Sequence, residues 1–238
     1  MRVFFSLPLL FTLLLCCSLA PDSEAGVTDK GYAKTLEALS SVICGDDELL
    51  NYNKGLIRAL SYTNKRALRA FSLLPDISAE ELVLSLKRLV NTPISFDNLL
   101  LFERFVTLQG ADVDNSWQFL EKMEALPYLP GRAMTGFELV DVLTAQDFLA
   151  AVDRVEQINE AGGWAVKAFM ELPGHSREGI VRGIGMVESM REKQQWAVEQ
   201  CCRMKGMDEY WALEVMAALR GLSGTDAWNA RGLMKQDV

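Results

Sequence analysis

Soft sulfur side chains gather near the end of the chain, where they could bind a metal ion. Cys201 and Cys202 are followed closely by Met204 and Met207, and thiolates and thioethers are the ligands that copper(I) prefers. Core packing explains the same residues, because methionine fills gaps in protein interiors and cysteine behaves there as a small apolar side chain. We therefore expect no metal ion and no other cofactor, with copper(I) binding as the alternative interpretation.

Three tryptophans recur at an interval of 32 residues. They are Trp164, Trp196 and Trp228, and Arg132 stands 32 residues before the first of them. If this interval is a structural repeat, the side chains form a column that could bind a peptide, a glycan or an apolar ligand. The alternative interpretation is packing between neighbouring helices. These four residues are the candidate binding residues of the chain.

The sequence offers few groups for catalysis. His175 is the single histidine, which excludes most metallohydrolases and Ser-His-Asp mechanisms, and no phosphate-binding loop, dinucleotide fingerprint or Cys-x-x-Cys pair is present. It falls in a predicted turn, where we expect it to be exposed to solvent. The net charge of −8 disfavours binding to nucleic-acid phosphates. We therefore predict a protein without enzymatic activity; the alternative is a small enzyme whose site lies in a groove.

The first 25 residues have the pattern of an export signal. Arg2 precedes an apolar run that continues through Leu15, and small residues precede a cleavage point between Ala25 and Gly26. We therefore predict a periplasmic or extracellular protein whose mature chain starts at Gly26. Two alternatives associate the chain with a membrane: an uncleaved N-terminal anchor, and a lipoprotein modified at the cysteines 16–17.

The rest of the chain has helical periodicity and a longer internal repeat. No window shows sustained strand alternation, and apolar residues recur at intervals of three and four. The segments 67–78 and 165–176 are identical at six of twelve positions. Starting from this match, an anchor position recurs every 32 to 34 residues and is occupied by Phe71, Phe105, Phe137, Phe169, Cys201 and Leu233.

Positions at fixed distances from the anchor predict the structure within each unit. The residues 3, 12, 15 and 18 positions after it are apolar in five consecutive units, which places them in the core. Ser78 with Glu81, and Thr144 with Asp147, have the capping-box pattern. Each unit is therefore predicted to be a helix, a tight turn and a second helix. The seventh position after the anchor is always a preferred N-cap: Ser78, Asp112, Thr144, Ser176 and Asp208.

This pattern resembles the α-solenoid proteins, such as HEAT and tetratricopeptide arrays, in architecture only, because the tetratricopeptide consensus is absent. The resemblance implies an all-α fold in which helix-turn-helix units stack as one domain over residues 26–238. Surfaces of such arrays usually bind protein or peptide partners, so we predict an exported protein-binding or scaffolding module. The units are a degenerate one at about 31–65, full ones from about 66, 100, 132, 164 and 196, and a terminal half-unit at 226–236.

The array also predicts the state of the cysteines and the role of two glycines. Cys44 lies in the first unit and Cys201 in the sixth, too far apart for a disulfide, so we expect free thiols with Cys201 buried. Gly183 and Gly185 interrupt a predicted helix. We expect them to permit a close approach by a neighbouring helix, and the alternative is contact with a ligand.

Overall fold

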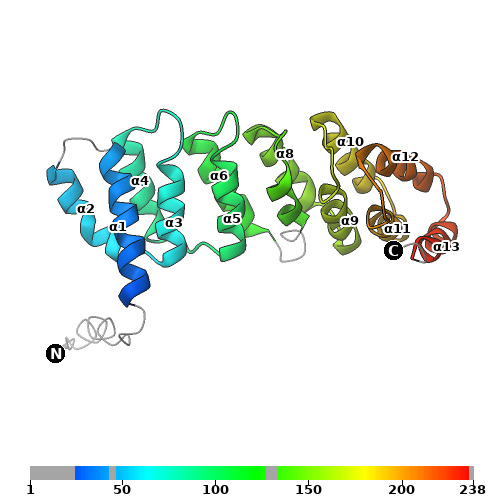
Figure 1. Ribbon diagram of the computed structural model, residues 1–238, viewed down its shortest axis with the longest axis horizontal. Helices are drawn as coiled ribbons and strands as arrows, with labels where there is room; N and C mark the ends of the chain where they lie inside the picture. The colour runs from blue at the N-terminus through cyan, green and yellow to red at the C-terminus, as the bar shows by residue number, and fades with distance from the viewer. Residues whose placement is uncertain (1–24, 43–46, 127–132, 236–238) are drawn as a thin grey trace, which may run out of the picture.

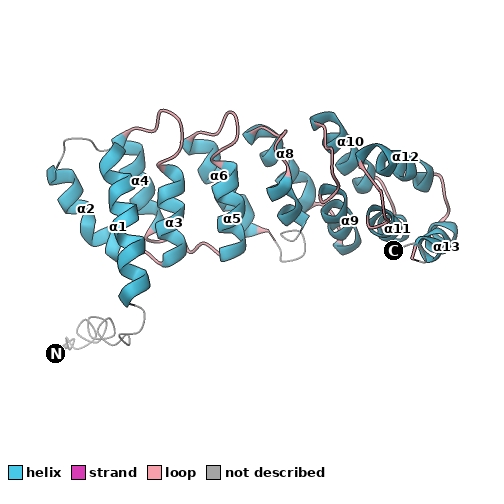
Figure 2. Cartoon of the chain, in the orientation of Figure 1, coloured by secondary structure: helices cyan, strands magenta, loops and turns pink. Residues whose placement is uncertain are grey.

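The computed structural model describes residues 25–42, 47–126 and 133–235, and the structural statements below refer to these ranges. Within them the chain is all-α: twelve α-helices and one short 3-10 helix are present, and no strand (Figure 2). The predicted fold class is thus confirmed at this level. Nearly all of the predicted export signal, and also Cys44 and Arg132, lie outside the described residues.

The helices follow one another as pairs joined by short turns. The first six are α1 (Ala25–Val42), α2 (Asp47–Ala59), α3 (Tyr62–Phe71), α4 (Ala79–Leu89), α5 (Phe96–Phe105) and α6 (Val113–Ala125). The 3-10 helix η1 (Thr135–Leu139) comes next. The last six are α8 (Ala145–Glu156), α9 (Glu160–Met170), α10 (Arg177–Glu188), α11 (Glu192–Cys202), α12 (Glu209–Arg220) and α13 (Gly224–Met234). Among the helices described, none has both the length and the apolar character that a membrane span requires.

These helices form an elongated row of two layers (Figure 1). In one layer α1, α3, α5, η1, α9, α11 and α13 each contact the next member of the series. In the other layer α2 contacts α4, and α6, α8, α10 and α12 contact one another in order. The helices also turn along the row: α1, α3 and α5 stand upright in Figure 1, whereas α11 and α13 are seen nearly end-on. Each helix pair therefore packs chiefly on its neighbours in the chain.

The anchor residues form the centre of the core. Phe71, Phe105, Phe137 and Phe169 are all 0% exposed, as the repeat predicts, and Cys201 is buried in the same way. Leu233 is 67% exposed, because it lies on the last described helix and no further pair covers it. Val181, twelve positions after an anchor, is a second departure, with 44% of its surface exposed.

The predicted N-caps begin the second helix of each pair. Ser78 and Thr144 form capping boxes as expected, and Asp112 forms another with Asn115. In the remaining two, the Ser176 hydroxyl accepts from the N–H of Gly179, and the Asp208 carboxylate accepts from the N–H of Trp211. The turn two residues before four of these caps contains a residue with positive φ, at Asp76, Gly110, Gly174 and Gly206.

The unit predicted to begin at about 132 departs from the expected pattern. The described part of its first helix consists of the α-helical residues 133–134 and the five-residue 3-10 helix η1. Gly136 in η1 packs closely on α9, since a Cβ there would lie 2.7 Å from the Cβ of Met170. The backbone of η1 thus lies directly against α9, and the helix-breaking residues Pro130 and Gly131 precede it in the sequence.

The two glycines of α10 have different surroundings. A Cβ at Gly183 would overlap the buried ring of Phe169 and lie 2.6 Å from its Cζ atom. A Cβ at Gly185 would meet only the Nη1 atom of Arg154, at an ordinary distance of 3.5 Å. Gly183 therefore makes space for a packed ring, and Gly185 faces the end of a flexible side chain.

We expect Gly183→Ala and Gly185→Ala to change stability in opposite directions. The first change displaces the ring of Phe169 and should lower the free energy of unfolding by about 1–2 kcal/mol. The second adds a better helix former in an open position and should raise it by up to about 1 kcal/mol. Denaturant unfolding of both variants measures the two effects. Changes of the same sign would contradict the packing of Phe169 over Gly183.

Candidate functional site

Two tryptophans of the predicted column enclose an arginine. The guanidinium carbon of Arg231 on α13 lies 5.3 Å from the ring centre of Trp196 on α11 and 4.8 Å from that of Trp228 on α13. The same guanidinium is 3.9 Å from a carboxylate oxygen of Glu199. Such an arrangement favours a cation over each ring face. Arg231 thereby joins α11 and α13, and the repeat pattern did not predict this role.

The exposure of the column rises toward the end of the row. Trp164 on α9 and Trp196 on α11 are half-buried, whereas 47% of Trp228 is exposed. The helices that carry them contact one another in sequence, α9 with α11 and α11 with α13. The three tryptophans therefore lie on successive members of one layer, and Trp228 offers the most surface to a partner.

The sulfur-rich segment is part of the core. Cys201 and Cys202 are free thiols with 1% and 6% exposure, and Met204 and Met207 are half-buried. Burial raises the pKa of Cys201 to about 11 and that of Cys202 well above its ordinary value. Metal binding requires thiolates, which this environment disfavours. In the described part of the chain no three His, Cys, Asp or Glu side chains are grouped so that they could hold a metal ion.

His175 corrects a prediction, because its side chain is only 6% exposed. Its Nδ1 atom lies 3.0 Å from Oε2 of Glu209, the first residue of α12. Glu209 also accepts from the backbone N–H of Ser176 at 3.0 Å and from its hydroxyl at 2.7 Å. Gly179 makes this approach feasible, since a Cβ there would overlap the Glu209 carboxylate. These residues join the turn before α10 to the start of α12.

The arrangement of these groups differs from that of a catalytic triad. The Ser176 hydroxyl donates to Glu209 and accepts from Gly179, so it is a helix cap whose proton is held by the carboxylate. The rings of His175 and Phe169 form an edge-to-face pair with 5.1 Å between their centroids. The Nε2 atom of His175 is buried without a hydrogen-bond partner. Nucleophilic catalysis needs a base on the hydroxyl, and here the histidine and the serine both bind the same carboxylate. The cluster therefore has the geometry of a clamp between helix pairs.

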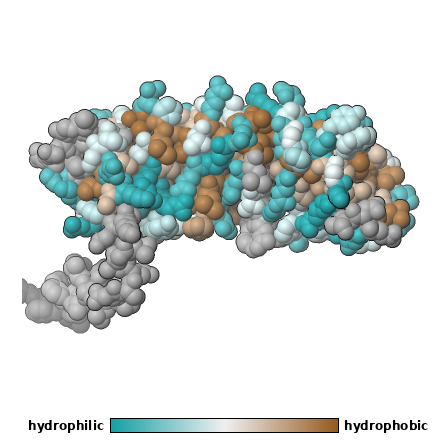
Figure 3. All heavy atoms as spheres, viewed as in Figure 1, coloured by the Kyte–Doolittle hydropathy of each residue, from teal (hydrophilic) through white to brown (hydrophobic). Residues whose placement is uncertain are grey.

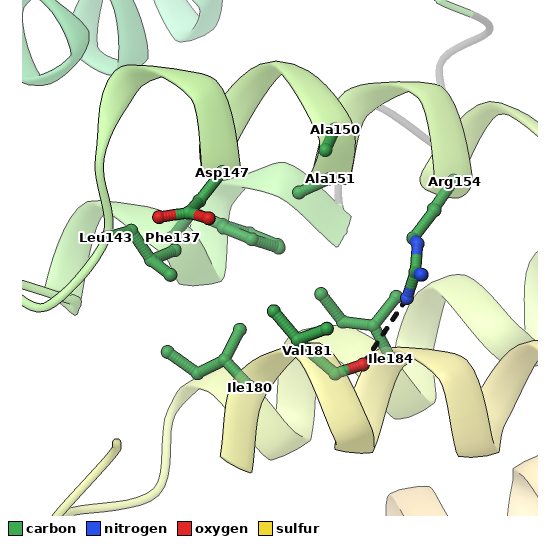
Figure 4. A pocket seen from close by; sticks show the side chains of 9 residues that line it. All are labelled: Phe137, Leu143, Asp147, Ala150, Ala151, Arg154, Ile180, Val181 and Ile184. Carbon is green, nitrogen blue, oxygen red and sulfur yellow. Dashed lines mark hydrogen bonds between the residues drawn. The ribbon is translucent and has the colours of Figure 1, made fainter. Parts of the chain in front are cut away.

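A pocket of about 180 Å³ lies between α8 and α10 (Figure 4). Ile180 and Ile184 line it from one helix and Ala151 from the other, and Phe137 of η1 adds an aromatic ring to the lining. Asp147 and Arg154, on the same helix α8, stand at opposite ends of it. The pocket is thus an apolar recess with an ionisable group at each end, which nothing in the repeat pattern singled out.

The acidic end of this pocket is neutralised by an ion pair. Arg177 donates two hydrogen bonds to Asp147, both of 2.8 Å, and the hydroxyl and N–H of Thr144 donate to the same carboxylate. The bonds from Arg177, more than those from Thr144, hold the pKa of Asp147 at about 2, below its ordinary value of 3.8. The other end therefore contributes the charge that remains available to a ligand.

We expect Arg177→Gln to raise the pKa of Asp147 toward its ordinary value. Because the folded-state pKa is lowered, the ion pair contributes stability above about pH 3.8, and this contribution is lost as the pH falls toward 2. The variant should therefore be less stable than the original protein above about pH 4, and this difference should shrink as the pH falls toward 2. A carboxyl-carbon NMR titration measures the pKa. Arg182→Gln, an exposed change on the same helix, serves as the control and should leave it unchanged.

Comparisons with protein families, with curated proteins and with solved structures found no match to this chain.

Proposed function

We propose that this protein is an exported α-solenoid that binds a protein or peptide partner and catalyses no reaction. Its units would be helix-turn-helix repeats with a period of 32 to 34 residues. The contacts of each layer support this architecture, because helices meet the next member of their own layer, as stacked repeats do. The gradual turn of the helices along the row gives further support (Figure 1).

The surface supports binding at several places along the row. Apolar residues form patches separated by hydrophilic ones on the face that Figure 3 shows. Large exposed side chains occur on both layers, among them Leu84 on α4 at 64% and Phe96 on α5 at 52%. A long surface with separated apolar patches suits an extended partner better than a compact small molecule.

Exposed aromatic rings on the last two helices carry the proposal. Tyr210 and Trp211 at the start of α12 are 64% and 57% exposed, and their rings meet edge to face at 5.3 Å. Trp228 on α13 adds a third ring, 47% exposed and backed by Arg231. Tyrosine, tryptophan and arginine are the residues most enriched among those that dominate binding energy at protein interfaces.

Photo-cross-linking in cells that produce the protein tests the proposal. A photoreactive phenylalanine analogue replaces Trp228, and a second variant carries it at Leu73, which is 68% exposed in the turn after α3. We expect a defined covalent adduct with a polypeptide from position 228 and none from position 73. If position 228 gives no adduct at native expression levels, the proposed partner surface is wrong.

Export is expected to remove residues 1–25. The predicted cleavage point follows Ala25, the first residue of α1, so the cut would remove a single residue from the described helices. Mass spectrometry of the protein from the secreted or periplasmic fraction should find a chain that starts at Gly26. A cytoplasmic chain that retains Met1 would contradict export, and a membrane-bound one would favour the anchored or lipidated alternatives.

A further inference from the structure

A ladder of ion pairs connects the second helices of successive pairs. Arg88 on α4 pairs with Glu121 on α6, and the next residue, Lys122, pairs with Asp153 on α8. Glu121 and Asp153 are 32 residues apart, so the acceptor occupies an equivalent position in each unit. Charged contacts of this kind repeat with the period of the chain.

The ladder is interrupted where α8 meets α10. Arg154 follows Asp153 and is the next basic member, but the acceptor position 32 residues after Asp153 is Gly185. Arg154 instead donates to the backbone oxygen of Val181 at 3.3 Å and forms a long ion pair, of 3.9 Å, with Glu188 one turn further along α10. Both of these contacts use its Nη1 atom, which leaves donors of the guanidinium for another acceptor.

The interruption coincides with the pocket. Arg154 lies at one end of it and reaches across to Val181, as the dashed line in Figure 4 shows. Val181 is also the residue that departs from the repeat by being 44% exposed. Two departures thus occur on one helix: Val181 lines the recess, and Gly185 faces Arg154 at its end. An aliphatic group in this recess would cover Val181, and a carboxylate beside it would take the place of the missing ladder acceptor.

The size of the pocket indicates what it can hold. Small-molecule sites usually measure about 300–1,000 Å³, and this recess measures about 180 Å³. It therefore suits one amino-acid residue better than a whole cofactor or metabolite. Because the apolar recess and Arg154 are adjacent, the aliphatic group and the carboxylate must be close together in the ligand. The C-terminal residue of a polypeptide carries both on a single residue.

We infer that the pocket between α8 and α10 binds the C-terminal residue of a partner polypeptide. Its aliphatic side chain lies against Ile180 and Ile184, and its terminal carboxylate accepts hydrogen bonds from Arg154. This inference rests on the proposed function, since it names the chemistry by which one segment of the partner is recognised. Arg177 remains committed to Asp147 and takes no part in binding.

Titration of the full chain with synthetic peptides tests the inference. The probe is a fluorescent hexapeptide that ends in leucine with a free carboxylate, compared with the same peptide as its C-terminal amide and with 4-methylpentanoate. Hydrogen bonds to a charged group predict that the amide binds at least about tenfold more weakly than the free acid. The free peptide should also bind more tightly than 4-methylpentanoate, because it contacts surface around the pocket.

Variants of the ladder separate binding from folding. Gly185→Glu supplies a carboxylate at the ladder position and should pair with Arg154. This variant should bind the free-acid peptide at least about tenfold more weakly, without loss of thermal stability. Arg154→Gln should weaken binding of the free-acid peptide to a similar extent. Arg88→Gln removes an equivalent ladder member away from the pocket and should leave the affinity unchanged.

Each other outcome overturns the inference in a recognisable way. Equal affinity for the free acid and the amide would exclude the carboxylate contact while leaving peptide binding, and so the proposed function, in place. Equal affinity for 4-methylpentanoate and the peptide would identify a small-molecule site. If no peptide bound below about 1 mM, the pocket would not be a recognition site, and cross-linking at position 228 would still test the proposed function separately.

Discussion

Replacing Phe105 with alanine is expected to lower the free energy of unfolding by about 3–5 kcal/mol. Phe105 is 0% exposed on α5. Its ring stacks on Phe119 of α6 with 4.4 Å between centroids, and meets Phe148 of α8 edge-on at 6.3 Å. The side chain thus joins three helices, and its removal leaves a cavity that the surrounding rings cannot fill without moving. Denaturant unfolding followed by circular dichroism measures the loss.

Phe96→Ala on the same helix is the matched control. Phe96 is 52% exposed, and the guanidinium carbon of Arg66 lies 5.7 Å from its ring centre. Its loss should cost less than about 1 kcal/mol. If Phe105→Ala does not fold, Phe105→Leu keeps most of the volume and should show a smaller loss of the same sign. Equal unfolding midpoints for Phe105→Ala and Phe96→Ala would show that the anchor position is not central to the core.

The helices and their starts were predictable because their signals are local. A residue such as Ser78 caps a helix through bonds to residues three positions away, and the capping box with Glu81 is visible in the sequence itself. The buried anchors were predictable because a two-layer row places equivalent residues in equivalent surroundings. Phe71 and Phe169 therefore share complete burial although they lie at different places in the row.

The departures from the repeat depended on neighbours that the pattern does not specify. The 3-10 geometry of η1 occurs where Gly136 lies closely against Met170 of the following helix, α9. Val181 lines the recess between α8 and α10 and is exposed, whereas the equivalent Leu149 is half-buried and the other equivalents are buried. A pattern averaged over all units predicts the typical environment of a position, and it misses the unit in which that environment differs.

The polar contacts between helix pairs were not predicted for a related reason. Their partners lie about one repeat apart, as in Arg66 with Glu103 and Arg104 with Asp141, separations of 37 residues in both cases. Many charged residues occupy the helix faces, so the period alone does not identify which two meet. Such pairs lie at the surface, where an ion pair usually contributes little stability. The ladder formed by Arg88 with Glu121 and Lys122 with Asp153 points to the pocket only because the structure shows that Gly185 occupies the next acceptor position.

The burial of His175 was missed because its partner comes from the following unit. A histidine in a turn is exposed when only its own helix pair is considered, and here Glu209 of α12 covers it. Gly179 contributes to the same contact by leaving room for the carboxylate. The clamp therefore depends on three features that lie apart in the sequence: the turn, the small residue on α10 and the acidic start of α12.

Glu209→Gln is expected to lower the free energy of unfolding by about 2–3 kcal/mol, because it disrupts this clamp. The Oε1 atom accepts from the hydroxyl of Ser176, while Oε2 accepts from its N–H and lies 3.0 Å from Nδ1 of His175. A carboxylate accepts all three contacts. The amide nitrogen of glutamine cannot accept. In place of Oε2 it would face the N–H of Ser176 as a second donor, and in place of Oε1 it would force the Ser176 hydroxyl to turn its proton away from the clamp.

Local opening should distinguish this loss from a general weakening of α12. Glu214→Gln, an exposed change on the same helix, is the control and should alter stability by less than about 0.5 kcal/mol. Amide hydrogen exchange in Glu209→Gln should increase at Ser176 and Gly179, whose N–H groups the clamp and the cap protect. Because neither amide lies on α12, increased exchange there would show that the carboxylate holds the preceding helix pair in place. Unchanged exchange at Ser176, with equal stability of the two variants, would mean that Glu209 contributes no more than a surface charge.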